Sequence, residues 1–337
     1  MRVNENILIS SLTTMRLGGP ARYVIEVESP ADVQYAYNFA GLQHLPIFVL
    51  GYGANTIGRD EGFPGVIIIN RMRGISEIPT ERGKVRLLIM GGELWDRVVE
   101  STTSRGLTGI EALSRIPGLA GAAPVQNIGA YGQELADTFV SADVYDSTTH
   151  SFKTLVKSEF NFGYRKSLLN TTEKNRYFVV SITLELHPGE MPRPFYHSVE
   201  NYIEEHNCKD FSPAGLRTII SDIRANKLPD PLERPSAGSF FKNVYLDEAG
   251  IDMAEEKGYP VYRGHDGYKI SSAWLIEQCG LSGKLIHGFR VNPKAPLVLL
   301  NESATSYADL DAARAEIIRN VYDKFGYWLE QEPVEIV

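Results

Sequence analysis

One segment of the chain limits the possible folds more than any other. Residues 116–132, IPGLAGAAPVQNIGAYG, are rich in glycine, alanine and proline, carry no charge and follow neither a helical nor a strand period. So long an irregular stretch in a compact domain is functional or disordered, and its many apolar side chains argue against disorder. Small residues let the backbone approach a flat ligand closely, and Asn127 can offer a directional amide. The segment predicts a ligand-contacting loop, with a tight structural loop as the alternative.

A second glycine-containing segment, GYGANT at residues 51–56, directly follows an apolar run expected to form a strand. Two glycines separated by one residue permit positive φ and leave backbone N–H groups uncovered, which suits a pyrophosphate. The dinucleotide-binding fingerprint of the Rossmann fold requires glycine at position 56, where Thr56 stands, so that fold is not supported. A plain turn at the end of a strand explains the same residues equally well.

The rest of the chain alternates strand and helix patterns, and its 337 residues are too many for one ordinary core, so we expect two or three domains. The expected strands are residues 23–27, 46–50, 66–69, 85–90, 140–145, 177–186, 297–300 and 327–337. The expected helices are residues 30–40, 93–104, 213–225, 272–279 and 306–324. A composition break at residues 187–194 predicts the boundary between two halves.

Charge and cysteine content exclude several classes of protein. The net charge of −8 argues against broad binding to nucleic acid or to an anionic membrane, because both need concentrated positive charge. Cys208 and Cys279 make no disulfide framework, and the seven histidines are scattered singly, so we expect no metal site. No apolar run is longer than a strand and no signal peptide is recognisable, so we expect a cytoplasmic protein.

Eight short motifs, each weak alone, occur in the order typical of one flavoprotein family. The sequence resembles the UDP-N-acetylenolpyruvoylglucosamine reductases, which belong to the vanillyl-alcohol-oxidase-like class. The motifs are TTMRLGGPA (13–21), LGYGANT (50–56), GVIIINR (65–71), IPGLAGAAPVQNIGAYG (116–132), FGYRKS (162–167), KLPDP (227–231), AGSFFKN (237–243) and WLEQE (328–332). They cover almost the whole chain, and their shared order leaves little room for chance.

The resemblance implies an α+β fold with a flavin domain and a substrate domain. Residues 1–187 would form an FAD-binding PCMH-type domain of two α+β subdomains, divided near residue 70. Residues 188–337 would form an α+β domain for the UDP-sugar substrate, and its final strand, about 326–337, would return to the active site.

The resemblance also implies non-covalent FAD and NADPH as co-substrate. The cofactor-binding residues would be Gly51, Tyr52, Gly53, Ala54, Asn55, Thr56, Pro117, Gly118, Ala122, Ala123, Asn127, Gly129 and Ala130. Ala54, Ala122 and Ala123 stand where the family often has small hydroxyl residues. Each alanine removes a side-chain hydrogen bond to the cofactor and leaves backbone donors in place.

The family reaction reduces the enolpyruvyl ether of UDP-N-acetylglucosamine-enolpyruvate to UDP-N-acetylmuramate for peptidoglycan synthesis. Hydride passes from NADPH through FAD to the terminal methylene carbon, negative charge spreads onto the carboxylate, and the adjacent carbon is protonated. Arg165 matches the family arginine, whose planar fork suits a carboxylate. Glu332 matches the glutamate that acts with it, and Ser239 matches the proton donor.

Five further residues match the family's substrate contacts. Lys227 and Asn243 would hold the phosphates and the nucleotide, since lysine is a sound partner for a diphosphate. Tyr196 would close over the diphosphate, as in the longer of the family's two subtypes. Tyr131 and Tyr164 would complete the substrate site. We expect a monomer whose partners are the sugar nucleotide and NADPH.

Glu332 lies five residues from the end of the sequence, where chains fray unless they are tied down. A catalytic role therefore requires that the last strand pair or pack, with Tyr327, Leu329 or Val334 buried. Glu330 shares strand parity with Glu332 and is the rival carboxylate.

Two other functions stay open from the sequence. A sugar or alcohol oxidase on the same FAD fold would usually attach its flavin through histidine or cysteine, and neither flavin loop contains one. A nucleotide-sugar-binding protein without activity would be expected to have lost Arg165, Ser239 or Glu332, and all three are present.

Overall fold

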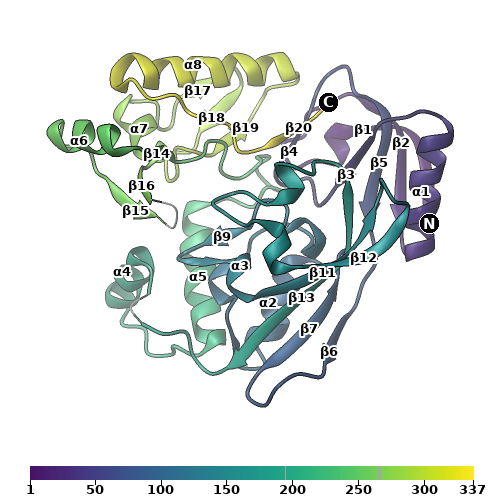
Figure 1. Cartoon of the computed structure of the whole chain (residues 1–337). Coiled ribbons are helices and arrows are strands. Elements are labelled where there is room, and N and C mark those ends of the chain that lie inside the picture. The colour runs from purple at the N-terminus through teal and green to yellow at the C-terminus, as the bar shows by residue number, and fades with distance from the viewer. Residues whose placement is uncertain (194, 265–266) are drawn as a thin grey trace. The chain divides into compact units, whose positions relative to one another are not determined.

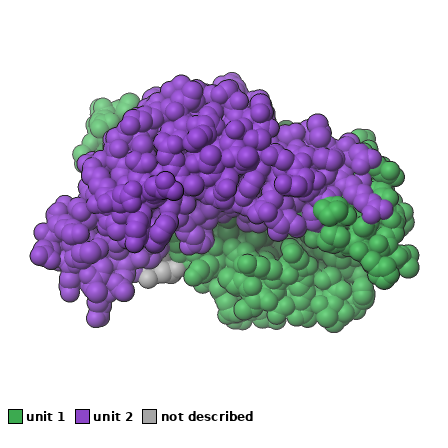
Figure 2. Space-filling model, turned by 90° about the horizontal axis from the view of Figure 1, so that it is seen from above, with its two compact units in different colours: residues 1–5, 23–52, 64–225 green, residues 6–22, 53–63, 226–337 purple. Residues whose placement is uncertain are grey.

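The computed structural model describes residues 1–193, 195–264 and 267–337, which divide by their contacts into two units (Figures 1 and 2). Unit 1 consists of residues 1–5, 23–52 and 64–225, and unit 2 of residues 6–22, 53–63 and 226–337. The expected boundary near residue 188 therefore lies inside unit 1, because helices α4 (His197–His206) and α5 (Pro213–Lys227) pack with Tyr131 and Met191 of that unit. Helices and strands mix in both units, which confirms the α+β class.

A four-stranded sheet leads the chain into the first glycine segment. Its order is β1 (Arg2–Leu8), β2 (Pro20–Val27), β5 (Phe63–Asn70) and β3 (Ile47–Leu50). Helix α1 (Pro30–Leu42) packs on its apolar side chains and begins with a capping box, in which Ser29 and Asp32 exchange side-chain-to-backbone hydrogen bonds. Strand β3 runs parallel to β5. The chain leaves β3 at Leu50 and enters GYGANT at the carboxyl ends of these two strands.

A larger antiparallel sheet in unit 1 supports the second glycine segment. Its order is β12 (Ser151–Val156), β11 (Phe139–Asp146), β13 (Tyr177–Pro188), β7 (Val85–Met90) and β6 (Ile75–Ile78), and β8 (Leu107–Thr108) also pairs with β13. Helix α2 (Trp95–Thr103) buries Trp95 in the core of this sheet. The loop 116–132 is fastened to the sheet, since the Gly121 N–H donates to the Gly91 carbonyl over 2.9 Å. A Cβ on Gly121 would lie 3.0 Å from that oxygen, so a small residue is needed there.

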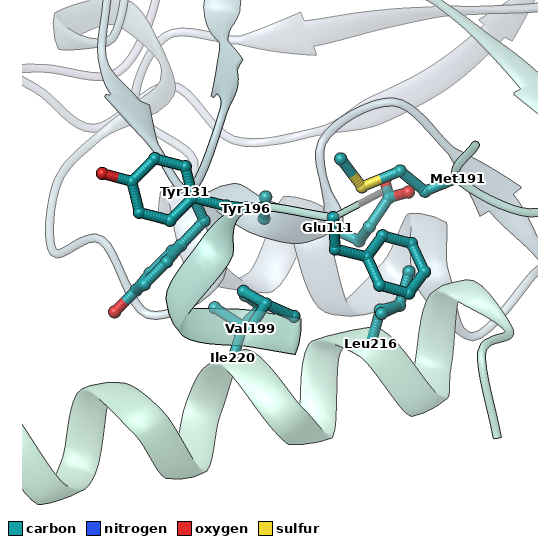
Figure 3. A pocket seen from close by; sticks show the side chains of 9 residues that line it. Glu111, Tyr131, Met191, Tyr196, Val199, Leu216 and Ile220 are labelled. Carbon is teal, nitrogen blue, oxygen red and sulfur yellow. The ribbon is translucent and has the colours of Figure 1, made fainter. Parts of the chain in front are cut away.

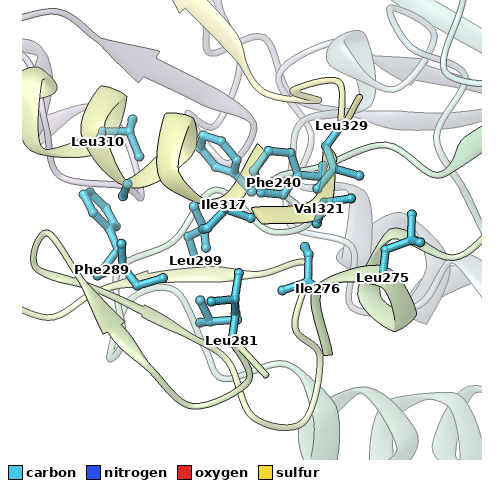
Figure 4. Packing of buried hydrophobic residues seen from close by; sticks show 14 of the residues in the cluster. Phe240, Leu275, Ile276, Leu281, Phe289, Leu299, Leu310, Ile317, Val321 and Leu329 are labelled. Atoms are coloured by element: carbon cyan, nitrogen blue, oxygen red, sulfur yellow. The ribbon is translucent and has the colours of Figure 1, made fainter. Parts of the chain in front are cut away.

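The core of unit 2 lies under helix α8 (Tyr307–Phe325), where Leu310, Ile317 and Val321 meet Phe240 and Phe289 (Figure 4). This is the apolar helix face that the sequence predicts. Two small antiparallel sheets complete the unit, one of β14 (Val244–Leu246), β16 (Gly267–Ile270) and β15 (Tyr262–Gly264), the other of β17 (Leu285–Ile286), β18 (Phe289–Val291) and β19 (Leu299–Asn301). The remaining helices of unit 2 are α6 (Glu248–Glu256) and α7 (Ser272–Gln278).

The remaining short elements lie in connections. They are β4 (Thr56–Gly58), β9 (Gly129–Ala130), β10 (Gln133–Glu134), α3 (Leu135–Thr138) and β20 (Val334–Ile336), with 3-10 turns at Ile9–Ser11, Glu111–Leu113, Ala120–Ala122, Lys157–Phe160 and Leu168–Asn170. In the described part of the chain, no helix combines the length and the apolarity that a membrane crossing requires.

The end of the chain is tied down in unit 2, as a role for Glu332 requires. Strand β20 pairs in parallel with β4, and the Val334 N–H donates to the Asn55 carbonyl over 3.0 Å. Tyr327 and Leu329 are buried as expected, and Ile336 is buried as well. Val334 is exposed and does not serve as an anchor.

Candidate active site

The two glycine segments approach each other closely within unit 1. A Cβ placed on Gly51 would lie 2.9 Å from the Cβ of Ala122, nearer than real Cβ contacts come. Glycine at the first position and a small residue at the second therefore allow both backbones to line one surface. Gly51 and Tyr52 belong to unit 1, whereas residues 53–56 of the same segment belong to unit 2.

Three contacts fasten the FGYRKS segment to the loop 116–132. The Asn127 side chain donates to the Gly163 carbonyl over 3.2 Å, and the Ser167 hydroxyl donates to the Val125 carbonyl over 2.7 Å. The Arg165 guanidinium donates to the Gly129 carbonyl over 3.2 Å. These bonds place the predicted arginine beside the predicted flavin loop.

Asn127 makes internal hydrogen bonds, and the cofactor contact expected for it stays a prediction. It is buried, it donates to Glu134 over 2.8 Å as well as to Gly163, and its oxygen accepts the Ala136 N–H over 2.9 Å. Its amide therefore stabilises the loop that carries the other candidate cofactor residues.

Arg165 has a left-handed backbone, with φ of 54°. Non-glycine residues in this region are strained, and such strain persists only where neighbouring groups hold it. The Asn170 amide supplies one hold by donating to the Arg165 carbonyl over 3.0 Å. The guanidinium carbon lies 5.0 Å from the centre of the Tyr164 ring, so two of the predicted substrate residues stack together.

Tyr131 and Tyr196, far apart in sequence, meet at a small cavity in unit 1 (Figure 3). Their ring centres lie 6.1 Å apart in an edge-to-face arrangement. Tyr196 stands at the start of α4 and is 52% exposed, whereas Tyr131 is half-buried at the end of the glycine-rich loop. Burial raises the pKa of the Tyr131 phenol, so its hydroxyl stays protonated near neutrality and can donate a hydrogen bond.

The cavity has a mostly apolar lining. Its walls are Glu111, Ala112, Tyr131, Met191, Phe195, Tyr196, Val199, Leu216 and Ile220. Figure 3 shows Val199, Leu216 and Ile220 projecting from α4 and α5 beneath the aromatic rings.

Ser239 and Glu332 lie in neighbouring extended segments of unit 2. The Glu332 N–H donates to the Phe240 carbonyl over 2.9 Å, and the Lys242 N–H donates to the Glu330 carbonyl over 2.8 Å. On the other side, the Phe240 N–H donates to the Leu297 carbonyl over 2.7 Å. AGSFFKN is thus the middle segment of three, and it lies beside the C-terminal segment that carries Glu332.

The rival carboxylate Glu330 has different surroundings. Its side chain is 73% exposed and forms an ion pair with Lys242, whereas Glu332 is half-buried. An exposed ion pair of this kind contributes little to stability. The surroundings favour Glu332 over Glu330 as the functional group.

A half-buried carboxylate network holds the last strand beside the end of GYGANT, residues 51–56. Glu335 accepts hydrogen bonds from Arg59 Nε over 2.9 Å, from the Tyr307 hydroxyl over 2.8 Å and from Arg314 Nη1 over 2.9 Å. Burial by itself would raise the pKa of Glu335, but these donors outweigh it and lower the pKa to about 2. The carboxylate is therefore charged near neutrality and holds β20 against β4 and α8.

The two remaining predicted residues are Lys227, at the end of a helix, and Asn243, directly before strand β14. Lys227 is the exposed last residue of α5, and its carbonyl accepts the Asn292 amide over 3.0 Å. The Asn243 side chain accepts the Ser272 N–H at the start of α7 over 3.2 Å. Both residues belong to unit 2, as do Ser239 and Glu332, whereas Arg165, Tyr131, Tyr164 and Tyr196 belong to unit 1.

Two residues of the site region have no role in the sequence-based prediction. Thr14 bonds across unit 2 to Ser236, and its position inside the TTMRLGGPA motif was the available signal. Arg224 lies on α5 with a buried Nε that has no hydrogen-bond partner in the described part of the chain. Burial lowers the pKa of Arg224, and nothing in the local sequence distinguishes it from a surface arginine on a helix.

Two parts of the chain match known protein families. Residues 230–336 match the C-terminal domain of UDP-N-acetylenolpyruvoylglucosamine reductase, and residues 21–154 match an FAD binding domain. The reductase of that name from Vibrio parahaemolyticus is 35% identical over 98% of this chain and 94% of its own length. The Ralstonia nicotianae reductase is 35% identical over 96% of both chains.

A solved structure supports the fold over the whole length. The UDP-N-acetylenolpyruvylglucosamine reductase of Thermus caldophilus superposes with a TM-score of 0.68 at 24% identity and covers 99% of each chain. Together with near-full-length identity of 35% to named relatives, this similarity confirms the resemblance in the motifs. The chain belongs to the family of UDP-N-acetylenolpyruvoylglucosamine reductases and contains that family's FAD-binding domain.

Proposed function

We propose that this chain reduces the enolpyruvyl ether of UDP-N-acetylglucosamine-enolpyruvate to UDP-N-acetylmuramate, with FAD as cofactor and NADPH as electron donor. The reaction would serve peptidoglycan synthesis in the cytoplasm, and the chain would act as a monomer. The observation that carries the proposal is the pairing of AGSFFKN with the C-terminal segment, in which the Glu332 N–H donates to the Phe240 carbonyl over 2.9 Å. This pairing supports the proposal because it joins the segment of the acid candidate to the segment of the carboxylate candidate, which lies 93 residues further along the sequence.

The residues fit a flavin. The close approach of Gly51 to Ala122 leaves two backbones uncovered by bulky side chains, and the space around a Cβ on Gly118 is open. Residues 51–56 together with Pro117, Gly118, Ala122, Ala123, Asn127, Gly129 and Ala130 would hold the cofactor mainly through backbone groups. When bound, FAD supplies the hydride chemistry that links NADPH to the substrate.

Arg165 would bind the substrate carboxylate, onto which negative charge spreads during reduction. The guanidinium donates to the Gly129 carbonyl, and the Arg165 carbonyl accepts a hydrogen bond from the Asn170 amide. Together these two bonds limit the positions that the guanidinium can take. A cation fixed in advance stabilises developing charge better than a mobile one, because little reorganisation is needed. Glu332 would act on the same developing charge.

Ser239 would donate the proton to the carbon next to the new methyl group. A serine hydroxyl is a weak acid, so it acts well only if its position is fixed and its oxygen is polarised. The backbone on its C-terminal side is held by hydrogen bonds from Phe240 to Leu297 and from Glu332 to Phe240. These bonds restrict the position of the backbone from which the hydroxyl projects.

The remaining residues would hold the UDP-sugar. Lys227 and Asn243 would contact the diphosphate and nucleotide, and Tyr131, Tyr164 and Tyr196 would enclose the substrate. Tyr196 suits a closing role because it is exposed at the start of α4, beside the half-buried Tyr131. In this proposal residues 1–187 supply the flavin domain and residues 188–337 the substrate domain.

The test is whether the purified protein oxidises NADPH only in the presence of the enolpyruvyl sugar nucleotide. UDP-N-acetylglucosamine, which lacks the enolpyruvyl group, is the matched control and should give no turnover. Loss of NADPH absorbance and formation of UDP-N-acetylmuramate should agree mole for mole. Equal NADPH oxidation with and without the enolpyruvyl group would overturn the proposal, and oxygen consumption with an alcohol or sugar would favour the oxidase instead.

A further inference from the structure

Two neighbouring threonines in unit 2 have the same burial and different partners. Thr13 and Thr14 are each 6% exposed. The Thr13 hydroxyl donates to the Leu17 carbonyl, four residues away, over 3.5 Å. The Thr14 hydroxyl donates to the Ser236 carbonyl over 2.6 Å, across 222 residues of sequence.

The backbone of Thr14 makes two more bonds that join the same segments. Its N–H donates to the Gly53 carbonyl over 3.0 Å, and its carbonyl accepts the Ser236 N–H over 3.0 Å. Gly53 has a φ of 74°, and a Cβ there would lie 2.1 Å from the Leu12 carbonyl oxygen. The turn at Gly53 is therefore packed directly against the residues around Thr14. It belongs to GYGANT, residues 51–56, the first of the two proposed flavin segments.

These bonds complete a closed path through unit 2. From Gly53 the path runs to Thr14, then to Ser236 and along the chain to Phe240. From Phe240 it crosses to Glu332, continues to Val334, and crosses to Asn55, two residues from its start. Ser239 lies on this path between Ser236 and Phe240. A displacement of Gly53 or Asn55 therefore also moves the segment that carries Ser239.

We propose that Thr14 is a positioning residue that fixes Ser239 relative to the first flavin segment. The other hydrogen bonds of the path join backbone atoms and survive most substitutions, whereas the Thr14 hydroxyl can be removed alone. Its loss removes this hydrogen bond to the Ser236 carbonyl, three residues before Ser239. The proposal rests on the proposed function for the role of Ser239, and it concerns protonation of the substrate rather than reduction of the flavin.

The experiment compares Thr14→Val, Thr14→Ser and Thr13→Val in anaerobic stopped-flow measurements. A misplacement of about 1 Å can lower a rate by about 10²-fold, so Thr14→Val should slow flavin reoxidation by the sugar nucleotide by about 10- to 100-fold. Reduction of the flavin by NADPH should change by less than about threefold. Thr14→Ser restores the hydroxyl and should recover most of the lost rate, and Thr13→Val should behave as the wild type.

A second readout does not depend on activity. Hydrogen exchange of the FAD-bound protein without substrate should be faster at the amides of residues 236–240 in Thr14→Val and unchanged in Thr13→Val. If Thr14→Val does not fold, Thr14→Ala, which introduces no methyl group opposite the Ser236 carbonyl, is measured in its place.

Three results would overturn the proposal. They are unchanged exchange at residues 236–240, an equal slowing of both half-reactions, and failure of Thr14→Ser to recover the rate. If the wild type does not transfer electrons to the sugar nucleotide, the proposed function is wrong, and the exchange data still decide whether Thr14 fixes the segment that carries Ser239.

Discussion

Units 1 and 2 fix their candidate catalytic residues by different kinds of bond. In unit 1, Arg165 lies in a left-handed conformation whose neighbourhood is held by side chains, chiefly Asn127, Ser167 and Asn170. In unit 2, Ser239 and Glu332 lie in segments that are held mainly by backbone pairing between residues 240–242, 297 and 330–332. The difference reflects the local sequence. The irregular loop 116–132 forms few backbone hydrogen bonds to neighbouring strands, whereas extended segments form many.

The difference teaches where single substitutions should matter. A backbone ladder survives the exchange of most side chains, so the pairing of the segments that carry Ser239 and Glu332 should tolerate most substitutions within those segments. A loop held by side-chain amides and hydroxyls loses part of its structure with each one removed. In unit 1, residues that never touch the substrate should therefore affect the reaction.

The largest effect is expected from Ser239→Ala, which removes the proposed acid and leaves its backbone frame intact. Reoxidation of the flavin by the sugar nucleotide should fall by about 10²- to 10⁴-fold, the usual loss for a positioned acid. Reduction by NADPH should stay near wild type. Stopped-flow traces in which both half-reactions slow equally would contradict the role given to Ser239. They would also contradict the view that backbone pairing holds this segment whatever side chain stands at position 239.

The second prediction separates the two glutamates of the C-terminal segment. Glu332→Gln should lower the rate of substrate reduction by about 10²-fold or more with FAD still bound, because the half-buried carboxylate acts on developing charge. Glu330→Gln removes only an exposed ion pair with Lys242 and should be mild. The reverse ranking in steady-state assays of both variants would mean that the functional carboxylate is assigned two residues away from its true position.

The third prediction tests the contrast between the units directly. Asn127→Leu keeps the approximate size of a buried side chain and leaves the Gly163 carbonyl and the Ala136 N–H without this partner. It should destabilise the protein by about 1–3 kcal/mol and slow substrate reduction, because Arg165 loses part of its support.

The matched control in unit 2 is Lys242→Met, whose backbone stays in the ladder to Glu330. Its stability should stay within about 0.5 kcal/mol of the wild type, as for most surface substitutions. Urea unfolding curves and turnover rates measure both variants. Similar losses in the two would remove the distinction between side-chain and backbone support.

The smallest effect is expected from Tyr196→Phe, which removes one hydroxyl from an exposed ring at the cavity of unit 1. Binding of the sugar nucleotide should weaken by about 0.5–1.5 kcal/mol, the contribution of an ordinary hydrogen bond. Flavin reduction by NADPH should not change. A substrate titration followed by flavin absorbance measures the shift, and unaltered affinity would exclude a diphosphate contact through this hydroxyl.

The sequence predicted much of the local structure, because periodicity and caps act over a few residues. The Ser29 cap, the apolar stripe of α8 and the β-branched run in β5 were all readable, since each depends on neighbours in sequence. The boundary expected near residue 188 and the division found at residue 225 differ, because α4 and α5 pack with side chains of unit 1. Composition shows a break between two sequence patterns. It cannot show on which core the next helix will pack.

The sequence by itself determined the family, the α+β class and the identity of the candidate residues, because these depend on the order of motifs along the chain. Only the tertiary structure decided which candidates share a frame. It paired the segment of Ser239 with that of Glu332, joined Asn55 to Val334, and assigned Asn127 to internal hydrogen bonds. The physical reason is that hydrogen bonds such as those from Glu332 to Phe240 and from Val334 to Asn55 join segments far apart in sequence and leave no periodic or compositional trace in either segment.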